Sequence, residues 1–233
     1  LVFASGANPE NCRMVDSRGI LGKHRKDIEA KKDEFANKWK LCNITNKEGR
    51  QGGIKEAMVG ADVVIALATP GPGIVLPEWV EGMAKDPVVF ACANPTPEIW
   101  PWEAKAAGAA VIATGRSDFP NQVNNSLGFP GIFRGALDVR AKTITDEMCI
   151  EASRALAAMA EAKGLSPEYI IPAMEEWELY PREAAAVAMK AIEQGVARIT
   201  TTYEEEYARA AAIISRSHEM VEIAQREGLV KVD

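Results

Sequence analysis

The sequence has few of the residues that build metal sites and disulfide frameworks. It contains four cysteines and two histidines among 233 residues, and no two cysteines form a Cys-x-x-Cys pair. This spacing supports neither a zinc site nor a disulfide-rich fold. It is typical of reduced thiols in a cytoplasmic protein, and the cysteines concerned are Cys12, Cys42, Cys92 and Cys149.

An excess of positive charge and a long apolar segment are also missing. The formal net charge is −6, whereas binding to nucleic acid requires clustered lysine and arginine. No apolar run approaches the roughly 18 residues that a membrane-spanning helix needs, and the first residues lack the basic and then apolar order of a secretory leader. We therefore expect a cytoplasmic protein whose partners are small molecules or proteins, not nucleic acid or a membrane.

A glycine-rich phosphate loop is the third missing feature. An apolar run ends at Asp16, where a dinucleotide-binding fold places an acid against a ribose. The glycine turn should precede this acid by roughly 20 residues, but only Gly6 precedes it here. Residues 1–6 predict the last turn of an apolar helix that Gly6 closes at its C′ position. We therefore expect the chain to begin inside the first crossover helix, without the first strand and the phosphate loop.

Four short runs rich in valine and isoleucine alternate with helix-like segments. The runs show no polar alternation, which is typical of strands buried on both faces of a parallel sheet. They predict a doubly wound, mostly parallel α/β sheet of the Rossmann type. The runs are residues 12–16, 62–67, 87–93 and 109–114, and the helix-like segments lie near residues 26–39, 53–60, 77–84 and 97–107.

Beyond about residue 144 the pattern becomes helical. An apolar stripe at helical spacing runs from Met148 to Met159, with Thr143 or Thr145 as the N-cap. A second helix should start near Pro181, and its alanines suit close packing against the sheet.

The last charged segment predicts a solvated helix that packs on a neighbour or on a second subunit. We therefore predict a truncated cofactor-binding domain over residues 1–140, followed by C-terminal helices over residues 141–233.

Two loops carry more side-chain amides than a scaffold requires. Residues 91–99 follow the third apolar run and place Asn94 at the carboxyl end of a strand, where open α/β sheets bind ligands. Residues 113–139 follow the fourth run. Amides can orient a carboxylate or a carboxamide, although a single one more often makes an Asx turn or a helix cap. We favour binding for the cluster of Asn121, Gln122, Asn124 and Asn125.

Three stretches resemble malic enzymes of the smaller bacterial and archaeal type. They are MVDSRGILGKHR (14–25), ACANPTPEI (91–99) and, most specifically, ATGRSDFPNQVNNSLGFPGIFRGALDVRA (113–141). The likeness continues more weakly to about Arg198, and we claim none for residues 199–233. It implies a homodimeric oxidoreductase that decarboxylates malate to pyruvate and CO₂ with NAD or NADP and a divalent cation, Mg²⁺ or Mn²⁺.

The resemblance also implies roles for individual residues. Asp16 and Arg25 match positions near the adenosine ribose, and Ala68 and Thr69 match positions close to the backbone of the cofactor. Asn94 matches an asparagine that faces both malate and the nicotinamide. Asn124 and Asn125 match residues that face the substrate. In the family the glycine turn, a catalytic Tyr, a catalytic Lys and the metal-binding carboxylates come earlier in the chain, so we assign no catalytic residue or metal ligand here.

The choice of coenzyme stays open at this stage. An acid at Asp16 favours the free ribose hydroxyls of NAD, whereas Arg18, Lys23 and Arg25 could neutralise the additional phosphate of NADP or simply form a solvated loop. Two other functions remain as alternatives. The chain could belong to another Rossmann-fold dehydrogenase, because a fold does not fix its chemistry, although the 113–139 segment argues against this. It could also be a non-catalytic nucleotide-binding or interaction module.

Overall fold

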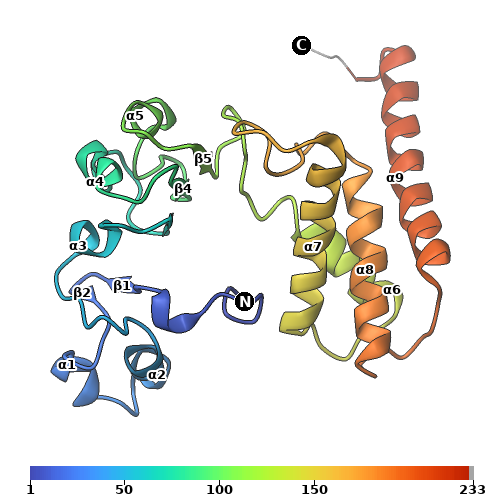
Figure 1. The fold of residues 1–233 in the computed structure, drawn as a ribbon. Coiled ribbons are helices and arrows are strands. Elements are labelled where there is room, and N and C mark those ends of the chain that lie inside the picture. The colour runs from blue at the N-terminus through green and yellow to red at the C-terminus, as the bar shows by residue number, and fades with distance from the viewer. Residues whose placement is uncertain (231–233) are drawn as a thin grey trace. The chain divides into compact units, whose positions relative to one another are not determined.

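The structure, a computed structural model, describes residues 1–230 and consists of two compact units (Figure 1). The first unit spans Leu1–Gln122 and the second begins at Val123. This division falls earlier than the domain boundary that we predict at residue 140. The reason is that helix α6 (Phe129–Asp138) packs against the C-terminal helices and therefore belongs with them.

A three-stranded parallel sheet forms the centre of the first unit. The strand order is β3-β4-β5, and the register pairs Val63 with Val88 and Val88 with Val111. Helices lie in the connections between strands, so the predicted alternation of strand and helix is confirmed. The elements are β3 (Val63–Ala66), β4 (Val88–Ala91), β5 (Val111–Thr114), α3 (Ile54–Met58), α4 (Pro77–Glu81) and α5 (Pro101–Ala106).

Burial of the strands differs from the prediction. In the central strand β4, Val89 and Ala91 are fully buried, as expected. In β3, however, Val63 and Ile65 are 48% and 51% exposed. The alternate residues Val64 and Ala66 pack against the core, so one face of β3 is covered and the other is exposed within the described chain. The prediction of burial on both faces is therefore wrong for β3.

The first apolar run does not join this sheet, which corrects the prediction of a fourth parallel strand. Strand β1 (Val15–Asp16) pairs antiparallel with β2 (Gly19–Ile20) in a short hairpin. The chain reverses there because the Asp16 carboxylate accepts a hydrogen bond from the Arg18 amide at 3.0 Å and Gly19 adopts a φ of 116°. An Asx turn followed by a residue with positive φ ends a strand after two residues.

The remaining segments of the first unit are short. Three backbone features close the N-terminal turn: Gly6 has a φ of 109°, its amide donates to the Phe3 carbonyl, and the Ala7 amide donates to Val2. This is the Schellman pattern expected for a C′ glycine, so the predicted closure at Gly6 is confirmed. The single helix that we predict over residues 26–39 is instead two helices. The elements are η1 (Pro9–Asn11), α1 (Lys26–Glu29) and α2 (Ala36–Ile44).

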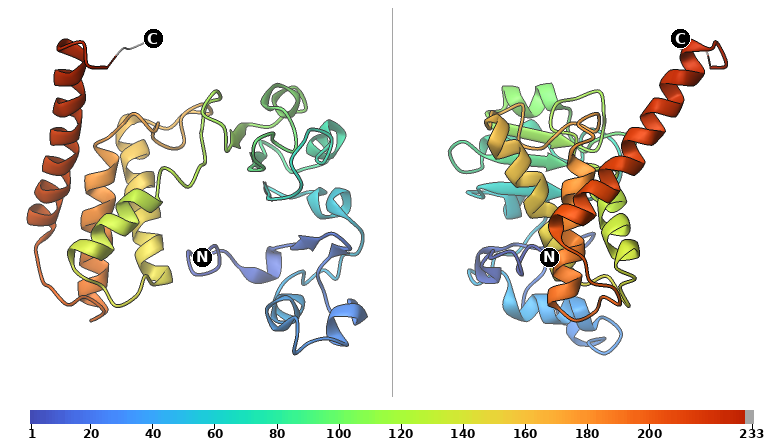
Figure 2. Two further views of the ribbon diagram at one scale, coloured as in Figure 1. Left: turned by 180° about the vertical axis from the view of Figure 1, so that it is seen from behind. Right: turned by 90° about the vertical axis from the view of Figure 1, so that its right-hand side faces the viewer.

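The second unit is a group of helices around α8 (Figures 1 and 2). The Thr145 side chain caps α7 by accepting from the Met148 amide at 3.2 Å. Of the predicted stripe, Met148, Ala152 and Met159 are buried, and the two stripe residues between Ala152 and Met159 are half-buried. The alanines of α8 are buried against α6 and α7 within this unit, so helices occupy the face that we predict to pack against the sheet, which corrects that prediction. Residues 231–233 lie outside the described residues. The helices are α6, α7 (Asp146–Lys163), α8 (Leu179–Glu193) and α9 (Tyr203–Arg226).

Helices α6 and α8 approach each other at two glycines. A Cβ atom added at Gly135 would lie 2.3 Å from the Ala184 carbonyl oxygen, and one added at Gly131 would lie 2.4 Å from the Cβ of Glu183. Both distances are far inside van der Waals contact. The spacing of these helices therefore requires glycine at both positions.

We expect Gly135→Ala to destabilise the second unit by about 1–3 kcal/mol, because the added methyl group meets backbone that cannot move aside. The free energy of unfolding measured with denaturant gives the value. Gly128→Ala is the control, since its Cβ would meet atoms at 3.8 Å and beyond, and loss of a glycine N-cap costs less than about 1 kcal/mol. Equal effects of the two substitutions would contradict the close approach.

An acid is buried where α9 meets α6. Glu206 is 0% exposed and its Oε2 accepts from Arg209 at 3.1 Å, while Asp138 of α6 faces it and is itself bound by Arg134. Burial first, and then the neighbouring Asp138 carboxyl group, raise the pKa of Glu206 to about 7. The protonated form therefore fits this contact better than the ionised form.

Because the folded pKa of Glu206 lies above its unfolded value, its contribution to stability is complete below about pH 4.5 and is lost as the pH rises through about 7. We expect the free energy of unfolding of the second unit to fall by roughly 1 kcal/mol between about pH 6 and pH 8. Denaturation at the two pH values measures this change. Glu206→Gln should remove the pH dependence, and a variant that keeps it would show that another group titrates.

Candidate functional site

Three loops leave the parallel sheet at the same edge. Because the strands are in register, Ala66, Ala91 and Thr114 end side by side. The Ala68 and Thr69 side chains follow the first of these ends and Asn94 follows the second, and all three are exposed. The carboxyl edge of an open parallel sheet is where such folds bind ligands. The structure thus brings these predicted residues onto neighbouring loops.

A buried carboxylate joins the first two loops. Glu98 is 0% exposed, and its Oε1 accepts from the Ala68 amide at 2.8 Å while its Oε2 accepts from the Ala93 amide at 3.0 Å. The Glu98 carbonyl also accepts from the Val75 amide. One side chain therefore sets the distance between the backbone before Thr69 and the backbone before Asn94. Glu98 is not among the residues predicted from the sequence, because an acid after two prolines resembles an exposed turn residue.

An arginine ties the third loop to the second. The Nη1 of Arg116, two residues beyond β5, donates to the Pro95 carbonyl at 3.0 Å. The same guanidinium holds Asp118 through two bonds of 2.7 Å, and this contact lowers the pKa of the Asp118 carboxyl. The backbone next to Asn94 is thus bound from both sides, by Glu98 and by Arg116.

The amides of the 121–125 cluster serve different purposes. Asn121 is 6% exposed with a φ of 56°, and its Nδ2 donates to the Ile112 carbonyl at 3.0 Å, so it ties the segment after β5 back to that strand. The Oδ1 of Asn124 accepts from the Ser126 amide at 3.0 Å, which is an Asx turn. The Asn125 side chain is exposed, and its carbonyl accepts the first amides of α6. Asn124 and Asn125 belong to the second unit, and their binding roles stay predictions.

Asp16 is the centre of a cluster of charges beside the hairpin. Its Oδ1 accepts from the Arg18 amide at 3.0 Å and from Arg25 Nη1 at 2.9 Å, and its Oδ2 accepts from Arg25 Nη2 at 3.3 Å and from Lys38 Nζ at 2.9 Å. Burial alone would raise the pKa of Asp16, but the hydrogen bonds from Arg25 and Lys38 outweigh it and hold the pKa at about 2. Asp16 is therefore ionised at neutral pH.

Arg25 uses all of its donors inside the protein. Its Nε and Nη2 hold Asp27 at 2.8 Å each, Nη1 and Nη2 hold Asp16, and Nη1 also donates to the Gly19 carbonyl at 3.3 Å. A guanidinium has five N–H groups, and the side chain of Arg25 is 8% exposed. Arg25 therefore orders Asp16, the acid at the end of β1, and has no N–H left for an external phosphate.

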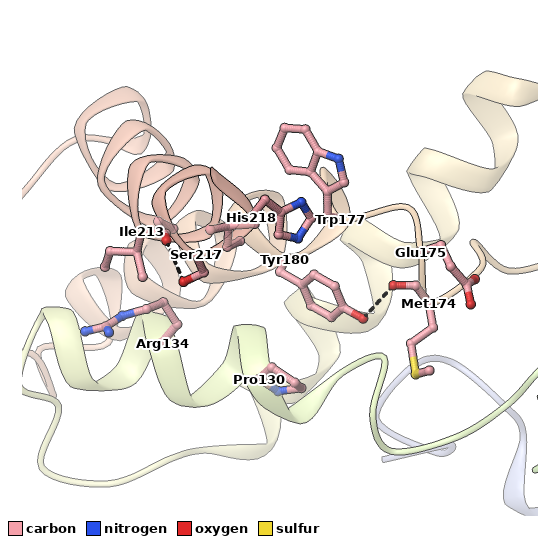
Figure 3. Close-up of a pocket in the computed structure, with 11 residues that line it drawn as sticks. Pro130, Arg134, Met174, Glu175, Trp177, Tyr180, Ile213, Ser217 and His218 are labelled. Atoms are coloured by element: carbon pink, nitrogen blue, oxygen red, sulfur yellow. Dashed lines mark hydrogen bonds between the residues drawn. The ribbon is translucent and has the colours of Figure 1, made fainter. Parts of the chain in front are cut away.

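A cavity of about 420 Å³ lies in the second unit between the start of α6, the segment before α8, and α9 (Figure 3). Aromatic and aliphatic side chains form most of its wall. The Tyr180 hydroxyl donates to the Met174 carbonyl at 3.2 Å, and the Trp177 and His218 rings meet edge to face with centroids 5.9 Å apart. None of the residues that we predict to bind malate or coenzyme lines this cavity.

The described residues show neither a metal centre nor a membrane span. Within residues 1–230, no three His, Cys, Asp or Glu side chains come close enough to hold a metal ion. No helix in the same range is both long and apolar enough to cross a membrane. The four cysteines are free thiols, and burial raises the pKa of Cys42, Cys92 and Cys149. We therefore derive no chemistry from a metal held by this part of the chain.

Comparison with known proteins confirms the resemblance seen in the sequence. Residues 4–194 match the family described as "Malic enzyme, NAD binding domain". The chain is 48% identical over 193 residues to the bifunctional malic/malolactic enzyme of Bacillus subtilis, which covers 82% of this chain and 45% of that protein. It is 42% identical over 213 residues to the NADP-dependent malic enzyme of Halomonas elongata, which covers 85% of this chain and 48% of that protein.

A solved structure extends the similarity to the C-terminal helices. The crystal structure of Entamoeba histolytica malic enzyme matches with a TM-score of 0.94 and 50% sequence identity, over 98% of this chain and 47% of that one. The match therefore includes most of residues 199–233, for which the sequence motifs gave no resemblance. The chain spans about half the length of the relatives that it matches.

We expect Glu98→Gln to destabilise the first unit by about 1–3 kcal/mol, because an amide offers one acceptor oxygen and leaves the Ala68 or the Ala93 amide without a partner. Denaturant unfolding followed by tryptophan fluorescence measures the change. Glu78→Gln, at an exposed position of α4, is the matched control and should change the free energy by less than about 0.5 kcal/mol. Equal stability of the two variants would show that the Glu98 contacts do not hold the loops.

Proposed function

The chain belongs to the family of malic enzyme NAD-binding domains, and from this membership we propose that it forms the coenzyme-binding part of an enzyme that oxidises malate to pyruvate and CO₂ with NAD or NADP. The observation that carries the proposal is the similarity to malic enzymes at 48% and 50% identity over 82% and 98% of the chain. Because the chain spans about half of these relatives, the complete reaction is assigned to the intact protein.

The carboxyl edge of the sheet suits a dinucleotide. Ala68 and Thr69 are small and exposed, so an extended cofactor can approach the backbone there. The buried Glu98 keeps this segment in a fixed position relative to Asn94. Asp16 presents an ionised carboxylate, which is the acceptor that a ribose hydroxyl requires. When bound, the coenzyme accepts the hydride from C2 of malate, and these residues hold it in place.

The side-chain amides position the substrate. We assign Asn94, Asn124 and Asn125 to malate, and Asn94 also to the nicotinamide end of the coenzyme. Asn94 and Asn125 have exposed side chains, and an amide donates to a carboxylate without adding charge. Holding the donor and acceptor carbons close together is itself a large part of catalysis of hydride transfer. We assign no proton transfer to a described residue.

The proposal also includes a homodimer, a cytoplasmic location and a divalent metal ion. A homodimer is supported by apolar side chains that α9 leaves exposed, such as Met220 and Val221 at 65% and 52%. A cytoplasmic location is supported by the four free thiols. The metal ion that the family resemblance implies, Mg²⁺ or Mn²⁺, would polarise the carbonyl group formed from malate. The described residues offer no cluster of ligands for it.

The test is malate-dependent reduction of NAD and NADP by the intact protein in the presence of Mn²⁺. We expect Asn125→Ala to lower kcat/KM for malate about ten- to a hundredfold, because one hydrogen bond to a charged group is lost. Asn37→Ala, at an exposed position of α2, should leave the kinetics unchanged. Absence of malate-dependent reduction would overturn the proposed function, and wild-type kinetics for Asn125→Ala would overturn the role of that amide.

A further inference from the structure

Lys38 is the side chain at Asp16 that can respond to the coenzyme. We propose that Lys38 sets the preference between NAD and NADP, by releasing Asp16 to the ribose of NAD or by pairing with the additional phosphate of NADP. This inference rests on the proposed function. It concerns a residue that lies 22 positions beyond Asp16 in the sequence, on helix α2.

Every hydrogen-bond acceptor site of the Asp16 carboxylate is occupied in the structure. A carboxylate has about four lone-pair sites, and Asp16 accepts four hydrogen bonds from Arg18, Arg25 and Lys38, two on each oxygen. A ribose hydroxyl that donates to Asp16 must therefore displace one of these donors. The question is which of them can leave at the smallest cost.

Two of the three partners are fixed. Arg25 is 8% exposed and binds Asp16, Asp27 and the Gly19 carbonyl at once, so its departure would leave buried groups unpaired. The Arg18 contact comes from its backbone amide and forms the turn of the hairpin. Removing either contact would disrupt the β1–β2 hairpin.

Lys38 is the donor that can leave. Its side chain is 46% exposed and makes one contact with Asp16, at 2.9 Å. A half-exposed ion pair of this kind is worth little, and the ammonium can return to water. Its Nζ also lies 5.7 Å from the centroid of the Phe35 ring, which offers the ammonium a second weak contact beside Asp16.

The two coenzymes make opposite use of this arrangement. With NAD, a ribose hydroxyl takes the place of the ammonium on Oδ2, so Lys38 competes with the coenzyme. With NADP, the phosphate on the ribose repels the ionised Asp16 and attracts a cation. Arg25 has no free N–H for that phosphate, whereas Lys38 uses one of its three donors. Lys38 therefore opposes NAD and supports NADP.

The experiment is titration of the intact protein with NADH and with NADPH, followed by coenzyme fluorescence, for the wild type, Lys38→Met, Lys38→Arg and Lys40→Met. We expect Lys38→Met to bind NADH about threefold more tightly and NADPH about five- to tenfold more weakly, since a partly exposed charge contact is gained or lost. Lys38→Arg should keep the wild-type ratio. Lys40 is exposed on the same helix, so Lys40→Met removes the same charge and should shift both affinities equally.

A measurement without coenzyme tests the contact between Lys38 and Asp16, and an unchanged pKa of Asp16 in Lys38→Met would contradict it. The pKa of the Asp16 carboxyl in the free protein, followed by NMR, should rise in Lys38→Met and stay unchanged in Lys40→Met, because Lys38 is one of the donors that hold it low. Thermal unfolding shows whether each variant is folded.

The titration distinguishes failure of the proposed function from failure of the role of Lys38. If the wild type binds neither coenzyme, the proposed function fails. If it binds them and Lys38→Met shifts both affinities by the same factor as Lys40→Met, the function stands and the role of Lys38 is overturned.

Discussion

The buried carboxylate of Glu98 is the contact on which the candidate site depends. Parallel strands in register bring their carboxyl ends to one edge, but the loops that follow would otherwise be free to separate. Glu98 accepts one amide from the loop after β3 and one from the loop after β4. Because both oxygens are removed from water, loss of either bond leaves a buried polar group unpaired. The positions of Thr69 and Asn94 follow from this pair of bonds.

A second charged group orders the β1–β2 hairpin, to which we assign the adenosine ribose, in a different way. Arg25 joins Asp16, Asp27 and the Gly19 carbonyl, so within our proposal this arginine orders the acid and leaves the contact with a phosphate to another cation. The sequence pattern cannot separate these roles, because both need a cation close to Asp16. The structure favours the first role, because all five N–H groups of Arg25 are occupied inside the protein.

The parts of the fold that follow from local sequence could be predicted, and the parts that follow from long-range contacts could not. Strands β3 to β5, the Gly6 turn and the Thr145 cap each depend on a few neighbouring residues. The hairpin at Asp16 escaped prediction because an apolar run does not show that the next residues reverse the chain. Glu98 and Glu206 stand in polar or acidic segments that look solvated, yet both are fully buried. Lys38 contacts Asp16 although the two are 22 positions apart in the sequence, and a separation of this length does not predict a contact.

The most specific sequence motif combines chemistry with packing. Residues 113–141 include Asn125, to which we assign substrate binding. They also include Asn121, which is bonded to β5, and Gly131 and Gly135, which allow α6 to lie against α8. A match to this motif therefore indicates the close packing of two helices as well as a shared reaction. This explains why the motif identifies the family firmly while it leaves the coenzyme undecided. Among the cations that contact the Asp16 carboxylate, Lys38 is the exposed one, and it lies outside the motif.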